Sequence, residues 1–198
     1  MGRHPLSCYI KNMRYTGIIA VLFLALTVTV TGQTRDSRDQ AVDTLLREIG
    51  IRTFDRSVEA VNFDLPLLDG TRSVLNDHRG SFVFLNFWAT WCPPCREEMP
   101  AMEELQRSLA DLPFTILAVS VQEDPATVSR FIDQYGFTFP ILLDRNGRVT
   151  ASYGVRGLPT SYFIAPDGRV AGMIVGILPW DDPAIVSRMR QAIEHYRR

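Results

Sequence analysis

Cysteine and histidine are scarce in this chain, with three of each among 198 residues. The cysteines are Cys8, Cys92 and Cys95, and the histidines are His4, His78 and His195. A zinc site built on a Cys-x-x-Cys pair usually needs a second such pair or two histidines at suitable spacing. Neither is present, so the sequence predicts no metal site.

An excess of charge of one sign is also lacking. Lysine and arginine together number 21 and aspartate and glutamate 22, which leaves a formal net charge of −1. This balance gives no reason to expect nucleic-acid binding. There is no internal repeat or low-complexity tract, and an apolar content of 46% is enough for a real core. The length suits an N-terminal extension and one domain of ordinary size.

The first 32 residues differ from the rest of the chain. They carry three positive charges, no acidic residue and the apolar stretch IIAVLFLALTVTV. This is the pattern of an export signal, and residues 15–30 approach the length of a membrane-spanning helix. We predict that residues 1–32 are either a signal peptide cleaved after Gly32 or a retained anchor. Both place the remainder outside the cytoplasm, in the periplasm or on the outer face of the membrane.

The exported part keeps few cysteines. A start at Met13 would remove Cys8, and with a start at Met1 that cysteine would stay on the cytoplasmic side. Only Cys92 and Cys95 then remain. In an oxidising compartment, a lone neighbouring pair favours a working redox site over a structural staple.

Cys92 and Cys95 belong to the sequence WCPPC, which directly follows an apolar run. The run FVFLNFW, residues 82–88, predicts a buried strand, and residues 93–109 predict an amphipathic helix. Cys92 therefore falls at a helix N-terminus, where the helix dipole and unpaired N–H groups favour a thiolate. We predict a redox-active disulfide as the only cofactor, with Cys92 attacking and Cys95 resolving.

The remaining pattern predicts an α/β domain at residues 59–198. Asp69-Gly70 indicates a β-hairpin, and buried strands are expected at FTILAVSV, ILLD, SYFIA and RVAGMIVG. Asp124-Pro125 is a typical helix start and Gly136 a typical stop. The result is a mixed central sheet with helices on both faces and an N-terminal hairpin extension. We expect residues 33–58 to be a linker with a short helix, which acts as a solvated spacer.

Three polar side chains near the motif are candidates for a role in the chemistry. Glu98 lies on the same helical face as Cys95, so it could accept the Cys95 proton if it is partly buried. The alternative is an ordinary first-turn acid favoured by the helix dipole. Asn86 interrupts the buried strand, which fits a satisfied core amide. Glu123 follows a strand end, where α/β folds gather their sites, which makes it a candidate for the substrate-binding site, although a plain loop acid fits as well.

Other residues are candidates for binding substrate. Trp91 is expected to border the cysteines as a contact surface, together with Pro93 and Pro94, which contribute no N–H donors to the helix start. The segment Gly157-Leu158-Pro159-Thr160 precedes a strand, and its X–Pro bond is a candidate for the cis isomer.

Two alternatives to disulfide exchange remain open for the motif. A purely structural disulfide would close too short a loop to remove much entropy from the unfolded chain. Peroxidases of related α/β folds place a Thr or Ser three residues before their reactive cysteine, where this chain has Ala89.

Taken together, these motifs resemble the thioredoxin superfamily, and specifically its exported TlpA/ResA-like thiol–disulfide oxidoreductases. The resemblance covers about residues 60–196. It rests on FVFLNFWATWCPPC, the EEMP after the second cysteine, VQED, YGFTFPILLD, and GLPTSYFI followed by PDG.

The resemblance implies roles for individual residues. Pro159 would be a cis-proline facing the disulfide, and the backbone around Leu158 would bind the substrate chain as an added strand. Glu98 and Glu123 would tune the active site. Thioredoxin carries a buried Asp where this chain has Asn86, and the exported part contains no lysine, so the Asp–Lys pair of thioredoxin is missing.

The resemblance also implies a function. Proteins of this type reduce protein disulfides outside the cytoplasm, such as the cysteines of apocytochrome c before haem attachment or those of copper-site assembly proteins. A membrane electron-transfer partner recharges them. A thiol oxidase or isomerase of the same fold and a non-catalytic binding module are the alternatives. The spacing of the cysteines disfavours a copper chaperone of the Cys-x-x-x-Cys type.

Overall fold

The computed structural model describes residues 37–197. The expected signal peptide or anchor, residues 1–32, lies outside the described residues, as do residues 33–36 and 198. Between residues 37 and 197, no helix is both long enough and apolar enough to cross a membrane.

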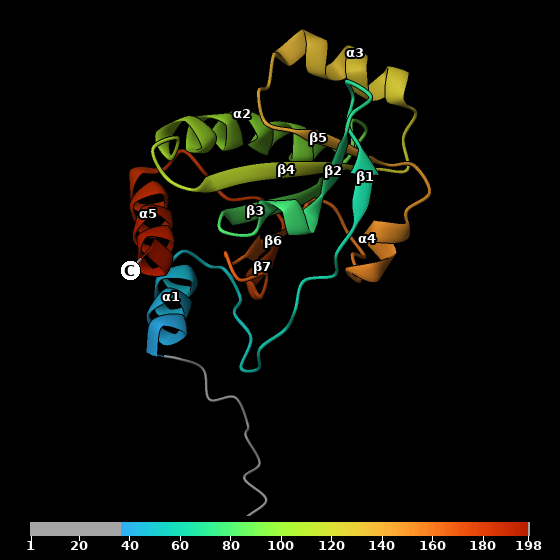
Figure 1. The fold of residues 1–198 in the computed structure, drawn as a ribbon. Coiled ribbons are helices and arrows are strands. Elements are labelled where there is room, and N and C mark those ends of the chain that lie inside the picture. The colour runs from blue at the N-terminus through green and yellow to red at the C-terminus, as the bar shows by residue number, and fades with distance from the viewer. Residues whose placement is uncertain (1–36, 198) are drawn as a thin grey trace, which may run out of the picture. The chain divides into compact units, whose positions relative to one another are not determined.

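A mixed five-stranded sheet forms the centre of the described part (Figure 1). Its strands β3, β4 and β5 are parallel, whereas β6 is antiparallel to β3 and β7 is antiparallel to β6. The spatial order is β5-β4-β3-β6-β7. The strands are β3 (Phe82–Trp88), β4 (Phe114–Val121), β5 (Ile141–Asp144), β6 (Thr160–Ile164) and β7 (Val170–Val175). The predicted mixed sheet is confirmed, and the strand that leads to the cysteines is its middle strand.

Helices lie on both sides of this sheet. They are α1 (Ser37–Glu48), α2 (Pro93–Ser108), α3 (Pro125–Tyr135), α4 (Arg148–Ser152) and α5 (Pro183–Arg197), and a short 3-10 helix, η1, spans Leu75–His78. The predicted ends of α3 are confirmed. The side chain of Asp124 accepts a hydrogen bond from the N–H of Ala126, and Gly136 ends the helix at a φ of 71°. Glycine adopts this left-handed conformation without steric cost.

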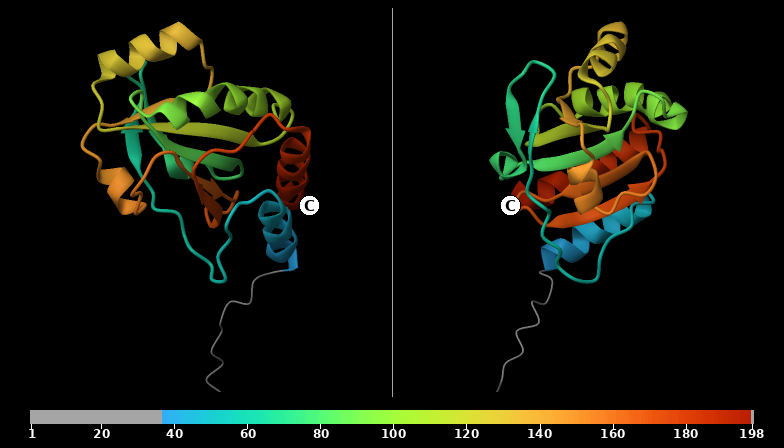
Figure 2. Two further views of the ribbon diagram at one scale, coloured as in Figure 1. Left: turned by 180° about the vertical axis from the view of Figure 1, so that it is seen from behind. Right: turned by 90° about the vertical axis from the view of Figure 1, so that its right-hand side faces the viewer.

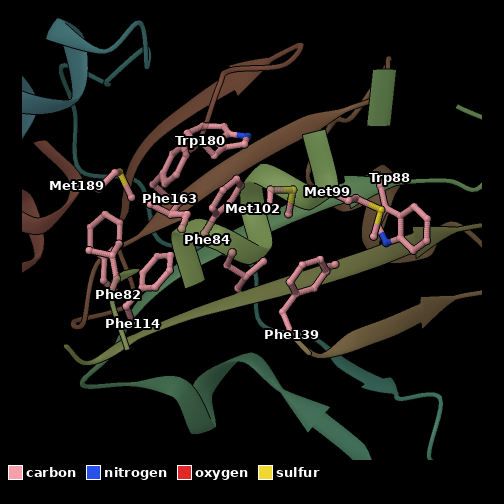
Figure 3. Close-up of a cluster of buried hydrophobic side chains, with 14 of the residues drawn as sticks. Phe82, Phe84, Trp88, Met99, Met102, Phe114, Phe139, Phe163, Trp180 and Met189 are labelled. Atoms are coloured by element: carbon pink, nitrogen blue, oxygen red, sulfur yellow. The ribbon is translucent and has the colours of Figure 1, made fainter. Parts of the chain in front are cut away.

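The two faces of the sheet are covered by different elements. Every residue of β3 is buried, which explains its continuous apolar run. Phe82, Phe84 and Trp88 pack with the apolar sides of α1, α2 and α5. Figure 3 shows this cluster, in which the ring centroid of Phe84 lies 4.9 Å from that of Phe163 and 4.7 Å from that of Trp180.

The alternate residues of β3 face the other side. Val83, Leu85 and Phe87 belong to a second cluster with Tyr153, which follows α4, and with Leu65 of the hairpin. The hairpin consists of β1 (Asp64–Pro66) and β2 (Arg72–Val74), which form their own antiparallel pair. The predicted N-terminal hairpin extension is therefore confirmed, and it covers part of this second face.

Residues 37–51 contradict the expectation of a solvated spacer. The short helix is present as α1, but Val42 and Leu46 are fully buried. Figures 1 and 2 show α1 beside α5, against which it packs. The backbone of Arg52 then bonds to Met173 of β7, with N···O distances of 2.9 and 2.8 Å. The spacer interpretation is wrong because the apolar residues of α1 pack against α5, which lies near the other end of the chain.

Candidate active site

Cys92 and Cys95 are joined by a disulfide at the start of α2. Cys92 is the N-cap residue, and its sulfur accepts a hydrogen bond from the N–H of Cys95 at 3.3 Å. Pro93 and Pro94 occupy the first helical positions, where a missing N–H costs no hydrogen bond. Cys92 is 4% exposed and Cys95 is fully buried. An incoming group can therefore reach Cys92 but not Cys95.

An open groove of about 500 Å³ lies beside Cys92. One wall comes from the motif itself, through Trp91 and the two prolines, and the other comes from the end of β4, from Thr150 of α4 and from the segment before β6. Its lining residues are Trp91, Cys92, Pro93, Pro94, Val121, Gln122, Thr150, Val155, Arg156, Gly157 and Leu158. Trp91 is 67% exposed, so its ring is available for contact with another molecule.

The peptide bond between Leu158 and Pro159 is cis, which is the isomer that the resemblance implied. Leu158 lines the groove with Cys92, whereas Pro159 is buried and does not line it. The carbonyl of Pro159 accepts a hydrogen bond from the N–H of Gly176 at 2.9 Å. This bond ties the segment to the end of β7 and holds Leu158 at the groove wall.

Glu98 is one of the buried residues of α2 and follows Cys95 by three positions. Its exposed fraction is 3%. One carboxylate oxygen accepts a hydrogen bond from the side-chain amide of Asn86 and the other accepts one from the indole N–H of Trp180, both at 2.9 Å. Burial raises the pKa of Glu98 to about 7, while the two hydrogen bonds act in the opposite direction. Glu98 is therefore poised to gain or lose a proton near neutral pH.

Asn86 connects Glu98 to the neighbouring strand. Its side-chain nitrogen also donates to the hydroxyl of Ser161 on β6, at 3.0 Å. The side-chain nitrogen therefore has hydrogen-bond partners, as expected for an amide in the protein core. The side-chain oxygen, in contrast, is buried without a hydrogen-bond partner among the described residues. Asn86 thus positions Glu98 without contacting the groove.

Glu123 supports the loop before the cysteines and does not line the groove. Its carboxylate accepts hydrogen bonds from the N–H of Thr90 at 3.0 Å, from the Thr90 hydroxyl, and from the Ser120 hydroxyl at 2.8 Å. Glu123 therefore positions the loop. It does not line the groove in which we expect the substrate to bind.

Sequence reasoning missed several residues of the site. Trp180 is separated from its partner Glu98 by 82 positions, and no local pattern links the two. Gln122 and Arg156 line the groove from loops. One signal was available for Gln122, because it lies at a strand end and directly before Glu123. Within residues 37–197, no group of three or more His, Cys, Asp or Glu side chains is placed to hold a metal ion.

Comparison with known proteins gives a family and relatives. A family model described as the AhpC/TSA family matches residues 57–173. The thiol-disulfide oxidoreductase ResA of Bacillus thuringiensis (strain Al Hakam) is 42% identical over 118 residues, which cover 60% of this chain and 68% of the relative. The matched family region runs from before β1 into β7, so it includes both cysteines, Glu98 and Pro159.

Solved structures show the same similarity. A candidate thiol:disulfide interchange protein DsbE from Chlorobium tepidum superposes with a TM-score of 0.65 and 33% identity, covering 71% of this chain and 99% of the other. The pneumococcal exposed lipoprotein thioredoxin Etrx1 from Streptococcus pneumoniae strain TIGR4 gives a TM-score of 0.58 and 28% identity, covering 66% and 99%. The described residues therefore have a thioredoxin-like fold.

Proposed function

The chain belongs to the AhpC/TSA family and is a thiol–disulfide oxidoreductase, and we propose that it reduces protein disulfides outside the cytoplasm. One observation carries the proposal. Cys92 borders an open groove at the start of α2, whereas Cys95 is fully buried behind it. A substrate disulfide therefore meets Cys92 first, and Cys95 acts second.

The exchange proceeds in two attacks. The Cys92 thiolate attacks one sulfur of the substrate disulfide, and the other substrate cysteine leaves as a thiolate that takes up a proton. The Cys95 thiol then loses its proton, and its thiolate attacks the Cys92 sulfur of the mixed disulfide. The second substrate cysteine leaves with a proton, and the product is the Cys92–Cys95 disulfide. Two electrons have passed from the dithiol to the substrate.

Glu98 is the proposed acceptor of the Cys95 proton. It follows Cys95 by three residues on the same helix, and both side chains are buried. Its pKa of about 7 means that much of it is ionised at neutral pH yet basic enough to take a proton. The hydrogen bonds from Asn86 and Trp180 keep the carboxylate in place.

The groove is the proposed binding site for the substrate chain. Trp91, Pro93 and Pro94 supply an apolar wall next to the attacking sulfur. The segment of Leu158 and Pro159 would pair with the substrate backbone as an added strand. In its support, neither the N–H nor the carbonyl of Leu158 has a hydrogen-bond partner within residues 37–197. Glu123 would act on this site only through the loop that it holds.

The proposed location is the periplasm or the outer face of the cytoplasmic membrane. It is supported by the export pattern of residues 1–32 and by the similarity to an exposed lipoprotein. The proposed substrates are exported proteins with reducible disulfides, such as apocytochrome c or copper-site assembly proteins. A membrane electron-transfer partner would return the disulfide to the dithiol.

The equilibrium reduction potential of Cys92 and Cys95 tests the direction of the reaction. The purified protein would be equilibrated in a glutathione or dithiothreitol series and its free thiols counted. We expect a potential near or below about −250 mV, close to that of thioredoxin. A potential near about −120 mV would make the protein a disulfide donor and would exclude the reductant role.

A trapping experiment tests the assignment of the two cysteines. A Cys95→Ser variant lacks the resolving thiol, so it should retain substrates as mixed disulfides on Cys92. A Cys92→Ser variant should retain almost none, because Cys95 is buried. Equal trapping by both variants would contradict the order of attack.

A further inference from the structure

Arg156 is the only residue with a charged side chain among those that line the groove beside Cys92. It lies two residues before Leu158 and is exposed. Within residues 37–197, its side chain takes part in no ion pair and no hydrogen bond. An uncompensated guanidinium thus borders the site where the substrate disulfide must arrive.

Two acidic residues lie close to groove-lining residues: Glu123 follows Gln122 in the sequence, and Asp144 bonds to Thr150, although its second carboxylate oxygen is buried without a hydrogen-bond partner among the described residues. Glu123, next to Gln122, accepts its hydrogen bonds from Thr90 and Ser120. Asp144 is 1% exposed, and one of its oxygens accepts bonds from the N–H and hydroxyl of Thr150 at 2.7 and 2.6 Å. Neither carboxylate forms an ion pair with the guanidinium.

We propose that Arg156 determines substrate specificity by binding a carboxylate of the substrate chain. This inference rests on the proposed function. A guanidinium binds a carboxylate through two parallel N–H···O bonds, which fix orientation as well as adding energy. Two residues of extended chain span at most about 7 Å, so a contact at Arg156 reaches only a short way from Leu158. The preferred substrates are therefore polypeptides with an Asp or Glu within two or three residues of the reactive cysteine.

The overall charge of the domain does not produce this preference. Without residues 1–32, the chain has 18 basic and 22 acidic side chains, so its net charge repels acidic partners at long range. The attraction is local to the groove, and it should weaken as salt is added. Apolar contacts with Trp91 and Leu158 would not weaken in this way.

The test uses three peptide disulfides that differ only at the position two residues from the reactive cysteine. That position is Glu, Gln or Lys. The reduced protein is mixed with each peptide, and the second-order rate constant for disulfide reduction is measured at low and high salt. The wild-type protein should favour the Glu peptide over the Lys peptide by about tenfold at low salt. Arg156→Gln should abolish the preference, and Arg156→Glu should reverse it.

Arg148→Gln is the matched control, because Arg148 is exposed on α4 and does not line the groove. It removes the same charge and should keep the wild-type preference. An unchanged preference in Arg156→Gln would overturn the proposal. So would an equal loss for all three peptides, since Arg156 would then act on the Cys92 thiolate and not on the substrate. Failure of the wild-type protein to reduce any peptide would instead contradict the proposed function.

Discussion

The carboxyl group of Glu98 experiences two opposing influences. Burial favours its neutral form, whereas hydrogen bonds from Asn86 and Trp180 favour the carboxylate. Burial has the larger effect, and the pKa rises to about 7. Asn86 contributes no charge of its own, so Glu98 is the titrating group of this hydrogen-bonded cluster.

Glu98→Gln should slow the attack of Cys95 on the mixed disulfide by about 100-fold at neutral pH, because the proton acceptor is lost. In the wild-type protein, the rate should rise with pH through an inflection near 7, where Glu98 ionises. The measurement is the release of a peptide preloaded on Cys92, followed from pH 5 to pH 9. The amide keeps the size of the side chain, so an inflection that persists in the variant would exclude Glu98 as the base.

Trp91→Ala should weaken substrate binding without weakening the fold. Trp91 is 67% exposed and lines the groove. Its loss should change the free energy of unfolding by less than about 0.5 kcal/mol, as for most exposed positions. The KM for a peptide disulfide should rise several-fold while kcat changes little. A drop in kcat alone would mean that Trp91 acts on the chemistry of Cys92 and not on binding.

Among the secondary-structure elements, α1 and α5 show how the two ends of the described chain depend on each other. Leu46 of α1 is fully buried in the same cluster as Met189 and Ile193 of α5. Gly172 of β7 also lies under the segment after α1, since a Cβ there would come within 2.6 Å of the Ile51 side chain. The region before the hairpin is therefore part of the folded domain.

Leu46→Ala should lower the free energy of unfolding by about 2–5 kcal/mol, because it leaves a cavity between α1 and α5. Thr44→Ala on the exposed side of the same helix is the matched control and should have a small effect. Urea denaturation of both variants provides the comparison. Equal stability of the two variants would restore the interpretation of this segment as a spacer.

Elements with strong local signals could be predicted from the sequence. The apolar run of β3 predicts a buried strand on its own. Asp124 and Gly136 mark the two ends of α3 through contacts with residues next to them in the sequence. The five-residue helix α4 was missed because Arg148–Ser152 is too short to show a helical period. The burial of α1 was missed because it depends on α5, more than 130 residues away.

The residues of the candidate site also fall into those with a local sequence signal and those that depend on distant parts of the chain. Cys92, Cys95 and Trp91 share one local motif, and the structure brings all three to the start of α2. The partner of Glu98, Trp180, comes from the segment before α5 and could not be inferred from spacing. Arg156 lines the groove from the loop between α4 and β6, and no local motif links it to the cysteines.

For the whole domain, Glu98 links stability to pH. An acid with a higher pKa in the folded than in the unfolded protein keeps its proton longer when folded. Between the two pKa values the folded state therefore binds more protons, and the free energy of unfolding falls as the pH rises. For Glu98 this window runs from its ordinary value of 4.5 to about 7. Across this window the free energy of unfolding should fall by about 3 kcal/mol, which follows from the difference between the two pKa values.

Urea denaturation of the oxidised protein between pH 4 and pH 8 tests this linkage. Other titrating groups, such as His78, contribute equally to the wild-type protein and to Glu98→Gln, so the difference between the two isolates Glu98. We expect the stability of the wild-type protein relative to the variant to decrease from about pH 4.5 to pH 7 and to be constant above that. A difference that does not change with pH would mean that the carboxyl group has an ordinary pKa. Glu98 would then be almost fully ionised at neutral pH and too weak a base to assist Cys95 efficiently.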